Sequence, residues 1–257
     1  MPRASGFWVS DGYGCFVPTS IDLAVVGGGV VGLALADAWL SRFPGESVVV
    51  YDKEDQLARH ASGRNSGVLH AGFYYAPDSL KARLTRDGNR MLREFCAQAG
   101  VEVLETGKVV VTTAEEQLPA LMMLVERGRA NGVDLELVDE VGLNELEPLA
   151  RTVQSALWSP TTAVADPVEV VRALAAQVER KGGRVEQGNQ VITGEAGQIV
   201  TARDGRISVG HVINAAGLYA DRVAHWFGFG EDYRMLPFKG LYWYGNWQAG
   251  KIGRAHV

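Results

Sequence analysis

The sequence has few of the features that would place it in a membrane, on nucleic acid or around a metal ion. Its two cysteines, Cys15 and Cys96, lie far apart and in no metal or redox spacing. The longest apolar run, Leu23 to Leu40, contains four glycines and Asp37, so no transmembrane segment is predicted. The net charge of −5 argues against a nucleic-acid partner. We therefore expect a protein of a reducing compartment in the cytoplasm, with peripheral membrane contact as an open alternative.

What the sequence does contain is a clear βαβ pattern near its start. Ile21 to Val26 is apolar and rich in β-branched residues, which predicts a buried strand. Val30 to Arg42 has helical spacing, and Ser47 to Tyr51 predicts a second buried strand. This order of elements predicts an α/β fold with a doubly wound, Rossmann-like domain.

The turn between the first strand and the helix has the pattern Gly27-x-Gly29-x-x-Gly32. In dinucleotide-binding folds the first glycine permits the tight turn, the second lets the backbone approach a pyrophosphate, and the third allows close helix–strand packing. Asp52 ends the second strand, where an acid would bind a ribose hydroxyl and repel a 2′-phosphate. The pattern predicts dinucleotide binding, and a purely structural glycine turn is the alternative.

The middle of the chain predicts further helices and strands. Asp78 is expected to cap a helix that runs to Gln98, with Leu80, Leu84, Met91 and Phe95 on one apolar side. Its four arginines predict a solvated basic face: Arg83, Arg86, Arg90 and Arg93. Thr113-x-x-Glu116 is a capping box that opens another helix, and Asp166-Pro167 marks a third helix start.

These elements predict a domain that is interrupted and then resumed. We expect a flexible extension over residues 1–20 and the first part of the dinucleotide-binding domain over 21–100. An α+β substrate domain is inserted at 101–164, and the first domain resumes over 165–232. Residues 233–257 would begin a second, truncated segment of the substrate domain.

A second glycine-rich loop, residues 61–72, follows the second strand, and a nicotinamide enzyme does not need such a loop there. From this point the sequence resembles the FAD-dependent oxidoreductases of the D-amino-acid-oxidase type, and within them the L-2-hydroxyglutarate oxidases and dehydrogenases. The resemblance rests on segments in the same order along the chain: Asn65 to Tyr75, Ser79 to Leu84, Gly107 to Val111, Glu126 to Gly132, Val212 to Arg222 and Pro237 to Gly240.

The resemblance implies an enzyme with non-covalently bound FAD that oxidises a small 2-hydroxy acid to a 2-oxo acid by hydride transfer to the flavin. L-2-hydroxyglutarate is the leading substrate. An amine or amino-acid oxidase of the same fold, or an inactive truncated flavin-binding fragment, remains an alternative. Arg64 and Leu241 depart from the family pattern and leave the exact substrate open. Oxygen, a quinone or a carrier protein could each be the electron acceptor.

The resemblance also implies that the natural chain continues beyond Val257, because family members are considerably longer. In one reading frame, Ile252 to Val257 matches the translation of a common sequencing-adapter sequence, although an ordinary basic tail would look the same. We therefore expect the chain to be truncated at its C-terminus.

The resemblance assigns roles residue by residue. His70 is the candidate catalytic base, since neutral imidazole titrates near working pH; it could equally pack against the flavin. Tyr74 and Lys239 are candidate substrate contacts. No metal ligands are predicted. The expected cofactor contacts lie in both parts of the interrupted domain: Gly27, Gly29, Gly32, Asp52, Ser62, Asn65, Ser66, Val191, Ala216, Gly217 and Asp221.

Overall fold

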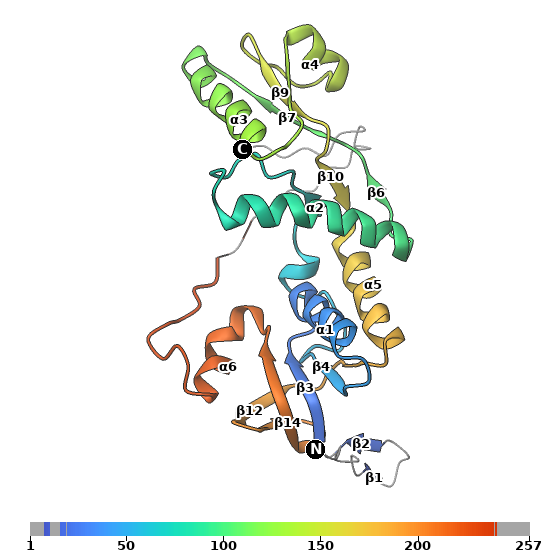
Figure 1. Cartoon of the computed structure of the whole chain (residues 1–257). Coiled ribbons are helices and arrows are strands. Elements are labelled where there is room, and N and C mark those ends of the chain that lie inside the picture. The colour runs from blue at the N-terminus through green and yellow to red at the C-terminus, as the bar shows by residue number, and fades with distance from the viewer. Residues whose placement is uncertain (1–7, 11–15, 19, 239, 241–257) are drawn as a thin grey trace. The chain divides into compact units, whose positions relative to one another are not determined.

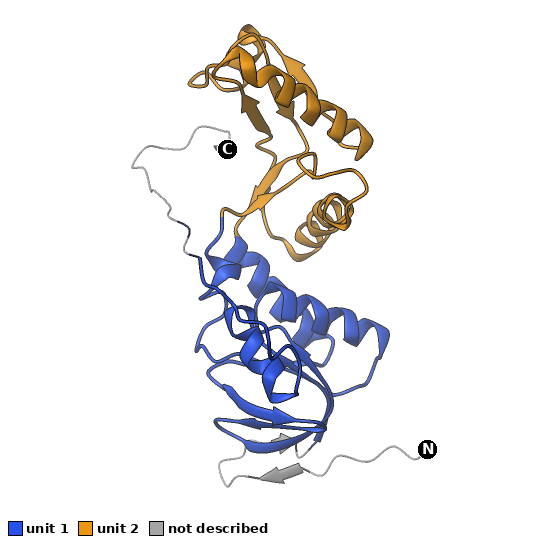
Figure 2. Cartoon of the chain, turned by 90° about the vertical axis from the view of Figure 1, so that its left-hand side faces the viewer, with its two compact units in different colours: residues 1–65, 167–242 blue, residues 66–166, 243–257 orange. Residues whose placement is uncertain are grey.

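A computed structural model describes residues 8–10, 16–18, 20–238 and 240 and divides the chain into two compact units (Figures 1 and 2). Unit 1 comprises Met1–Asn65 and Pro167–Tyr242. Unit 2 comprises Ser66–Asp166 and Trp243–Val257. Two positions discussed above, Lys239 and Leu241, lie outside the described residues.

Unit 1 is built on a six-stranded sheet. Its first four strands in spatial order run parallel, the fifth pairs antiparallel with the fourth through a hairpin at Asp204-Gly205, and the sixth pairs antiparallel with the fifth. In spatial order the strands are β11 (Arg184–Glu186), β4 (Val48–Tyr51), β3 (Ser20–Val26), β14 (Gly205–Asn214), β13 (Gln198–Thr201) and β12 (Val191–Glu195).

Helices cover both faces of this sheet. Val25 of β3 faces helix α1 (Val30–Arg42), which packs against α5 (Pro167–Arg180). Its neighbours along the strand, Ala24 and Val26, point to the other face and share a core cluster with Val223 of α6 (Ala220–Trp226). Both faces of β3 are thus buried, which is why its sequence is a continuous apolar run. The expected doubly wound α/β domain is confirmed.

Shorter elements complete unit 1. The 3₁₀ helices η1 (Ala61–Gly63) and η3 (Gly217–Tyr219) follow β4 and β14 along the chain. In the segment expected to be a flexible extension, β1 (Trp8–Ser10) pairs antiparallel with β2 (Phe16–Pro18). No helix among the described residues is both long and apolar enough to cross a membrane.

Unit 2 contains two three-stranded sheets, in the orders β5-β10-β6 and β7-β9-β8. Helix α3 packs against the second sheet through a core of Leu121, Phe73 and Leu157. The elements in chain order are β5 (Val68–Leu69), α2 (Leu80–Ala99), β6 (Val103–Leu104), β7 (Lys108–Val111), η2 (Glu115–Gln117), α3 (Leu118–Ala130), β8 (Glu136–Val138), α4 (Glu140–Leu146), β9 (Ala156–Ser159) and β10 (Ala163–Ala165).

The first boundary between the units differs from the expected position at residue 100. Strand β10 pairs with both β5 and β6, and its Val164 lies opposite Val68 on one side and Leu104 on the other. This pairing places β5 and α2 with the inserted segment. Strands of two or three residues, separated by almost a hundred positions, leave no periodic signal in a sequence.

Two predicted helix starts are wrong. Ser79, and not Asp78, caps α2, where its hydroxyl accepts a hydrogen bond from the Ala82 N–H at 3.1 Å. The α-helix expected after Thr113 begins only at Leu118, and the Thr113 N–H binds the Gln117 side chain at 2.7 Å. At α2 a second capping residue stands one position after the predicted one, and local chemistry alone does not rank the two. At α3 the 3₁₀ turn η2 separates Thr113 from the α-helix.

The predicted apolar and basic faces of α2 are also wrong in part. Leu80, Leu84 and Met91 are 59%, 59% and 60% exposed, whereas the helix is buried through Ala82 and Cys96.

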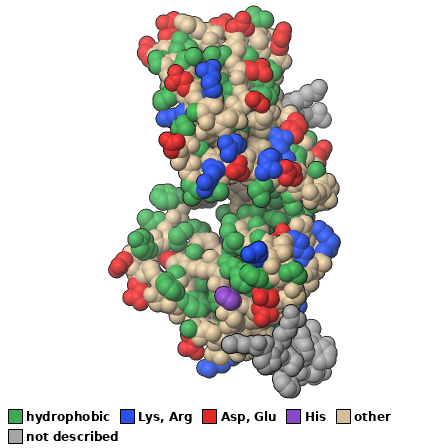
Figure 3. Space-filling model, viewed as in Figure 1, with side chains coloured by type: hydrophobic (Ala, Val, Ile, Leu, Met, Phe, Trp, Pro, Cys, Tyr) green, Lys and Arg blue, Asp and Glu red, His purple; other side chains and the backbone are tan. Residues whose placement is uncertain are grey.

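Lys and Arg side chains do gather over α2, as Figure 3 shows. Two of the four arginines nevertheless bind within unit 2: Arg86 donates to the Asn131 carbonyl and Arg93 to the Thr161 carbonyl. Long side chains can reach such partners from a helix face that appears solvated in the sequence.

Candidate functional site

The glycine turn after β3 is a point of close backbone contact. Gly27 has φ +111°, and a Cβ there would lie 2.3 Å from the carbonyl oxygen of Ala215. A Cβ on Gly32 would lie 2.0 Å from the carbonyl oxygen of Gly27. No real side chain tolerates such distances, so the fold itself requires these two glycines.

Gly29 differs from the other two glycines of the motif. Its φ of −76° is ordinary, and the nearest atom to a Cβ would be the Ser62 Oγ, at 2.9 Å, with no backbone atom within 4 Å. The fold therefore gives no strong reason for a glycine here. A ligand that approaches the first turn of α1 gives one, because the backbone amides of that turn have no intrahelical partners. The turn thus fits the pyrophosphate of a dinucleotide.

Ser62 lies at the same helix end. Its hydroxyl accepts a hydrogen bond from the Val30 N–H at 3.0 Å. Asn65 closes η1 by donating from Nδ2 to the carbonyls of Ala61 and Ser62, at 3.0 and 3.1 Å. Unit 1 therefore brings Ser62 to the glycine turn, while Ser66 belongs to unit 2, and the cofactor contacts of both remain predictions.

Asp52 is joined to the glycine turn through its side chain. Its Oδ2 accepts a hydrogen bond from the Gly28 N–H at 2.8 Å, and its Oδ1 accepts one from the Glu54 N–H at 2.9 Å. Each carboxylate oxygen can accept more than one hydrogen bond, so both remain available to a ribose hydroxyl. The carboxylate therefore fixes the turn and stands where the sequence predicts a ribose contact.

We expect Asp52→Ala to weaken dinucleotide affinity by roughly 1–3 kcal/mol, the usual contribution of a charge-assisted hydrogen bond. Asp52→Asn should lose less affinity, because its amide oxygen still accepts one hydrogen bond. Flavin titration of the apoprotein measures both dissociation constants. If Asp52→Ala leaves the constant unchanged, Asp52 only holds the loop.

The segment after β14 meets the same turn. The Ala215 N–H donates to the Val26 carbonyl at 2.9 Å, and Gly217 has φ +56° with no atom within 4 Å of a Cβ. Ala216 lies between them, and its Cα would be 3.1 Å from a Cβ on Gly27. The structure therefore brings the second predicted contact segment against the first.

Two further predicted cofactor residues have structural partners of their own. Asp221 accepts a hydrogen bond from the Met235 N–H at 3.0 Å, and this bond is the main reason that its pKa is lowered. Val191 is 5% exposed and belongs to the core cluster of unit 1. A cofactor contact of either residue remains a prediction.

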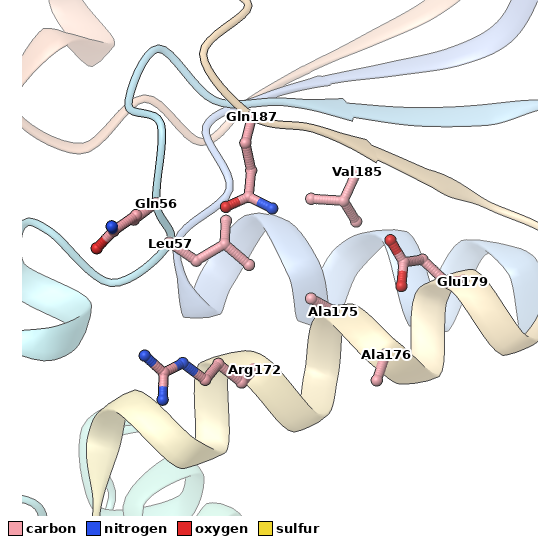
Figure 4. A pocket seen from close by; sticks show the side chains of 8 residues that line it. All are labelled: Gln56, Leu57, Arg172, Ala175, Ala176, Glu179, Val185 and Gln187. Carbon is pink, nitrogen blue, oxygen red and sulfur yellow. The ribbon is translucent and has the colours of Figure 1, made fainter.

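Unit 1 contains a cavity of about 300 Å³ close to the glycine turn (Figure 4). It lies between α5, β11 and the loop that follows β4, and Leu57 on its wall also neighbours Gly28. Its lining contains one charge of each sign and no histidine, cysteine or lysine: Gln56, Leu57, Arg172, Ala175, Ala176, Glu179, Val185 and Gln187. The cavity therefore offers shape beside the glycine turn and no reactive group.

In unit 2, the predicted residues His70 and Tyr74 share their surroundings with Lys108. The Lys108 ammonium lies 4.6 Å from the centre of the Tyr74 ring. The pKa of His70 is lowered, first by desolvation and then by the charge of Lys108. Desolvation raises the pKa of Tyr74 to about 12. Lys108 is the residue that sequence reasoning missed, because a lysine at the start of a strand is usually exposed.

Two buried or half-buried asparagines hold the loop that carries His70 and Tyr74. Asn89 Nδ2 donates to the carbonyls of Leu69 and His70, at 2.9 and 3.2 Å. Asn131 Nδ2 donates to the carbonyls of Gly72 and Tyr75, each at 3.1 Å. The loop backbone is therefore anchored on both sides of the candidate base.

Comparisons with known proteins identify relatives of this chain. The chain is 37% identical over 240 residues to the human mitochondrial L-2-hydroxyglutarate dehydrogenase, covering 87% of this chain and 52% of that protein. It is 38% identical over 226 residues to L-2-hydroxyglutarate dehydrogenase of Indibacter alkaliphilus, covering 85% and 56%. The chain thus spans about half the length of these relatives.

Solved structures show the same fold. L-α-glycerophosphate oxidase from Mycoplasma pneumoniae, with FAD bound, superimposes with a TM-score of 0.74 at 25% identity, over 81% of this chain and 57% of that one. L-proline dehydrogenase from P. horikoshii gives a TM-score of 0.70 at 23% identity, over 83% and 57%.

The family model described as "FAD dependent oxidoreductase" matches residues 22–252, which covers both units. This match, with the curated relatives above, confirms the resemblance drawn from the sequence and the expectation of an FAD-binding family. The chain belongs to the family of FAD-dependent oxidoreductases of the D-amino-acid-oxidase type.

Proposed function

We propose that the protein oxidises an L-2-hydroxy acid, foremost L-2-hydroxyglutarate, to the corresponding 2-oxo acid with FAD as its cofactor. The observation that carries this proposal is the 35–38% identity to relatives named L-2-hydroxyglutarate dehydrogenase, over 84–87% of the chain. The arrangement of unit 1 supports the cofactor. The group around His70 in unit 2 supports the chemistry.

In unit 1, the residues that would hold FAD are those gathered at the glycine turn. Gly29 and the first turn of α1 would receive the pyrophosphate, and Asp52 would bind the adenosine ribose. FAD, when bound, supplies the acceptor for the hydride that leaves the substrate carbon. The remaining requirements fall on groups that bind the substrate and remove a proton.

His70 is the group proposed to remove that proton. Oxidation of an alcohol to a carbonyl releases the hydroxyl proton as the hydride leaves the same carbon, so a neutral base must stand beside the hydroxyl. Because its pKa is lowered by desolvation and by Lys108, His70 is neutral at pH 7 and can accept this proton on a ring nitrogen. Tyr74 and Lys239 are proposed substrate contacts.

Anaerobic mixing with substrate tests the proposal. We expect L-2-hydroxyglutarate to bleach the flavin absorbance of the purified protein, with one 2-oxoglutarate formed per flavin reduced. D-2-hydroxyglutarate is the matched control and should leave the spectrum unchanged. Flavin reduction by an amino acid, with release of ammonia, and none by L-2-hydroxyglutarate would replace the proposal with an amine oxidase.

We propose that electrons leave the reduced flavin to oxygen, a quinone or a carrier protein, and reoxidation rates with each would choose among them. A cytoplasmic location, or one at a membrane surface, is part of the same proposal. Several animal relatives are named as mitochondrial, whereas the name of the Indibacter alkaliphilus relative gives no compartment.

A further inference from the structure

Lys108 is a buried cation without an anion. The residue is 4% exposed, and no carboxylate or carbonyl of the described residues forms an ion pair or hydrogen bond with its ammonium. Desolvation alone accounts for the lowering of its pKa, with no contribution from a charged neighbour. Removing an ammonium from water is costly unless an opposite charge or hydrogen-bond acceptor replaces the water.

The hydroxyl of Tyr74, the residue whose ring contacts Lys108, also lacks a partner that would replace the water lost on burial. Its oxygen is buried and has no hydrogen-bond partner among the described residues. The Tyr74 ring does contact the ammonium, at 4.6 Å from its centroid, and this cation–π contact offsets only part of the desolvation. The described part of unit 2 thus contains a buried ammonium without an anion and, on the tyrosine whose ring it contacts, a buried hydroxyl without a hydrogen-bond partner.

Local structure fixes Lys108 in this place. Gly107 before it has φ +63°, and a Cβ there would lie 1.7 Å from the ring of Trp158, so only glycine fits. Ser159, the partner of Lys108 across β7 and β9, has its hydroxyl bonded to Thr162 Oγ1 at 3.0 Å. The Ser159 hydroxyl, opposite Lys108, is thus hydrogen-bonded to Thr162 and not to the Lys108 ammonium.

We propose that Lys108 and the Tyr74 hydroxyl together bind a carboxylate of the substrate. A carboxylate has oxygens enough to accept a hydrogen bond from each donor, so one ligand group would satisfy both. That the ligand is a 2-hydroxy acid, or its 2-oxo product, rests on the proposed function.

Binding at this site would also act on His70. The positive charge of Lys108 makes protonation of His70 less favourable. A bound carboxylate would neutralise that charge, so His70 would become a stronger base when substrate is present. The same ion pair would then hold the substrate and tune the group proposed to take its proton.

Calorimetric titration of 2-oxoglutarate into the oxidised flavoprotein tests this inference. We expect Lys108→Met to raise the dissociation constant at least tenfold without changing flavin content. Lys81→Met is the matched control, because Lys81 lies in the same unit and also contacts a tyrosine ring, that of Tyr75 at 4.4 Å, but is exposed. Its dissociation constant should stay within twofold of wild type.

A second readout separates binding from packing. In Lys108→Met, the acid limb of the kcat/KM profile should move to higher pH, because His70 loses a repelling charge. An unchanged dissociation constant and an unchanged acid limb in a folded Lys108→Met variant would overturn the inference. If that variant does not fold, Tyr74→Phe decides: weaker 2-oxoglutarate binding supports the carboxylate site, and wild-type binding refutes it.

Failure of the proposed function gives a different result. If L-2-hydroxyglutarate does not reduce the flavin while 2-oxoglutarate still binds in a manner that depends on Lys108, the carboxylate site stands and the substrate assignment falls. If L-2-hydroxyglutarate is oxidised at the same KM by wild type and Lys108→Met, the substrate assignment stands and the carboxylate site falls.

Discussion

Gly29→Val is expected to abolish FAD binding and leave the fold intact. The backbone at Gly29 is in an ordinary conformation, and a Cβ there meets only the Ser62 hydroxyl, which can rotate away. The valine methyl groups would instead fill the space in front of the first turn of α1, where the pyrophosphate is predicted to lie. We expect flavin content near zero in a protein whose circular dichroism spectrum matches that of wild type.

Variants at two other glycines serve as controls for Gly29→Val. Gly32→Val should lose the fold as well as the flavin, because its Cβ would lie 2.0 Å from the Gly27 carbonyl oxygen. Gly88→Ala, in a helix and with no atom within 4 Å of its Cβ, should keep both. A ratio of flavin to protein absorbance and a thermal melt for each variant provide the comparison. Full flavin content in folded Gly29→Val would remove the pyrophosphate from this turn.

The first half of unit 1 could be predicted because its signals are local. The helix over Val30 to Arg42 has the predicted bounds, and the strand predicted at Ile21 begins one residue earlier. An apolar β-branched run, a glycine turn and a segment with helical spacing each depend on neighbours within a few positions. The three glycines could be identified from the motif, but only the structure separates the two that the fold requires from Gly29.

Unit 2 could be predicted less well because distant pairings decide its arrangement. Strand β5 has two residues, and its partner β10 lies more than ninety positions along the chain. Helix α2 packs through the small residues Ala82 and Cys96, while larger apolar residues such as Met91 are exposed, so its apolar pattern indicated the wrong face.

The residues around the candidate base could also be predicted only in part, because some of them come from distant positions in the sequence. His70 and Tyr74 could be singled out because a resemblance covers their loop, whereas Lys108 reads as the first, solvent-facing residue of a strand. Gly107, directly before β7, has φ +63° and lies against the ring of Trp158 in β9, a contact that the sequence pattern does not show. A spacing rule does not capture a cation that meets a tyrosine across thirty-four positions of chain.

His70→Ala is expected to lower the rate of flavin reduction by about 10² to 10⁴, the usual contribution of a general base. Flavin content should stay near wild type, because His70 lies in unit 2 and the glycine turn lies in unit 1. Stopped-flow mixing with L-2-hydroxyglutarate under anaerobic conditions measures the rate. His211→Ala is the control: His211 lies in unit 1 against Trp39, with 5.2 Å between the ring centres, and the rate should not change.

The pH dependence gives the sharper test of the same role. A lowered pKa means that His70 stays neutral below the ordinary value of about 6.5, so the wild-type rate should be level through neutral pH and fall only under more acidic conditions. In His70→Ala this acid limb should disappear along with most of the rate. A variant that is slow but keeps the limb would assign the titration to another group. A variant that reduces flavin at the wild-type rate would remove His70 from the chemistry and leave it as a packing residue of the loop that Asn89 holds.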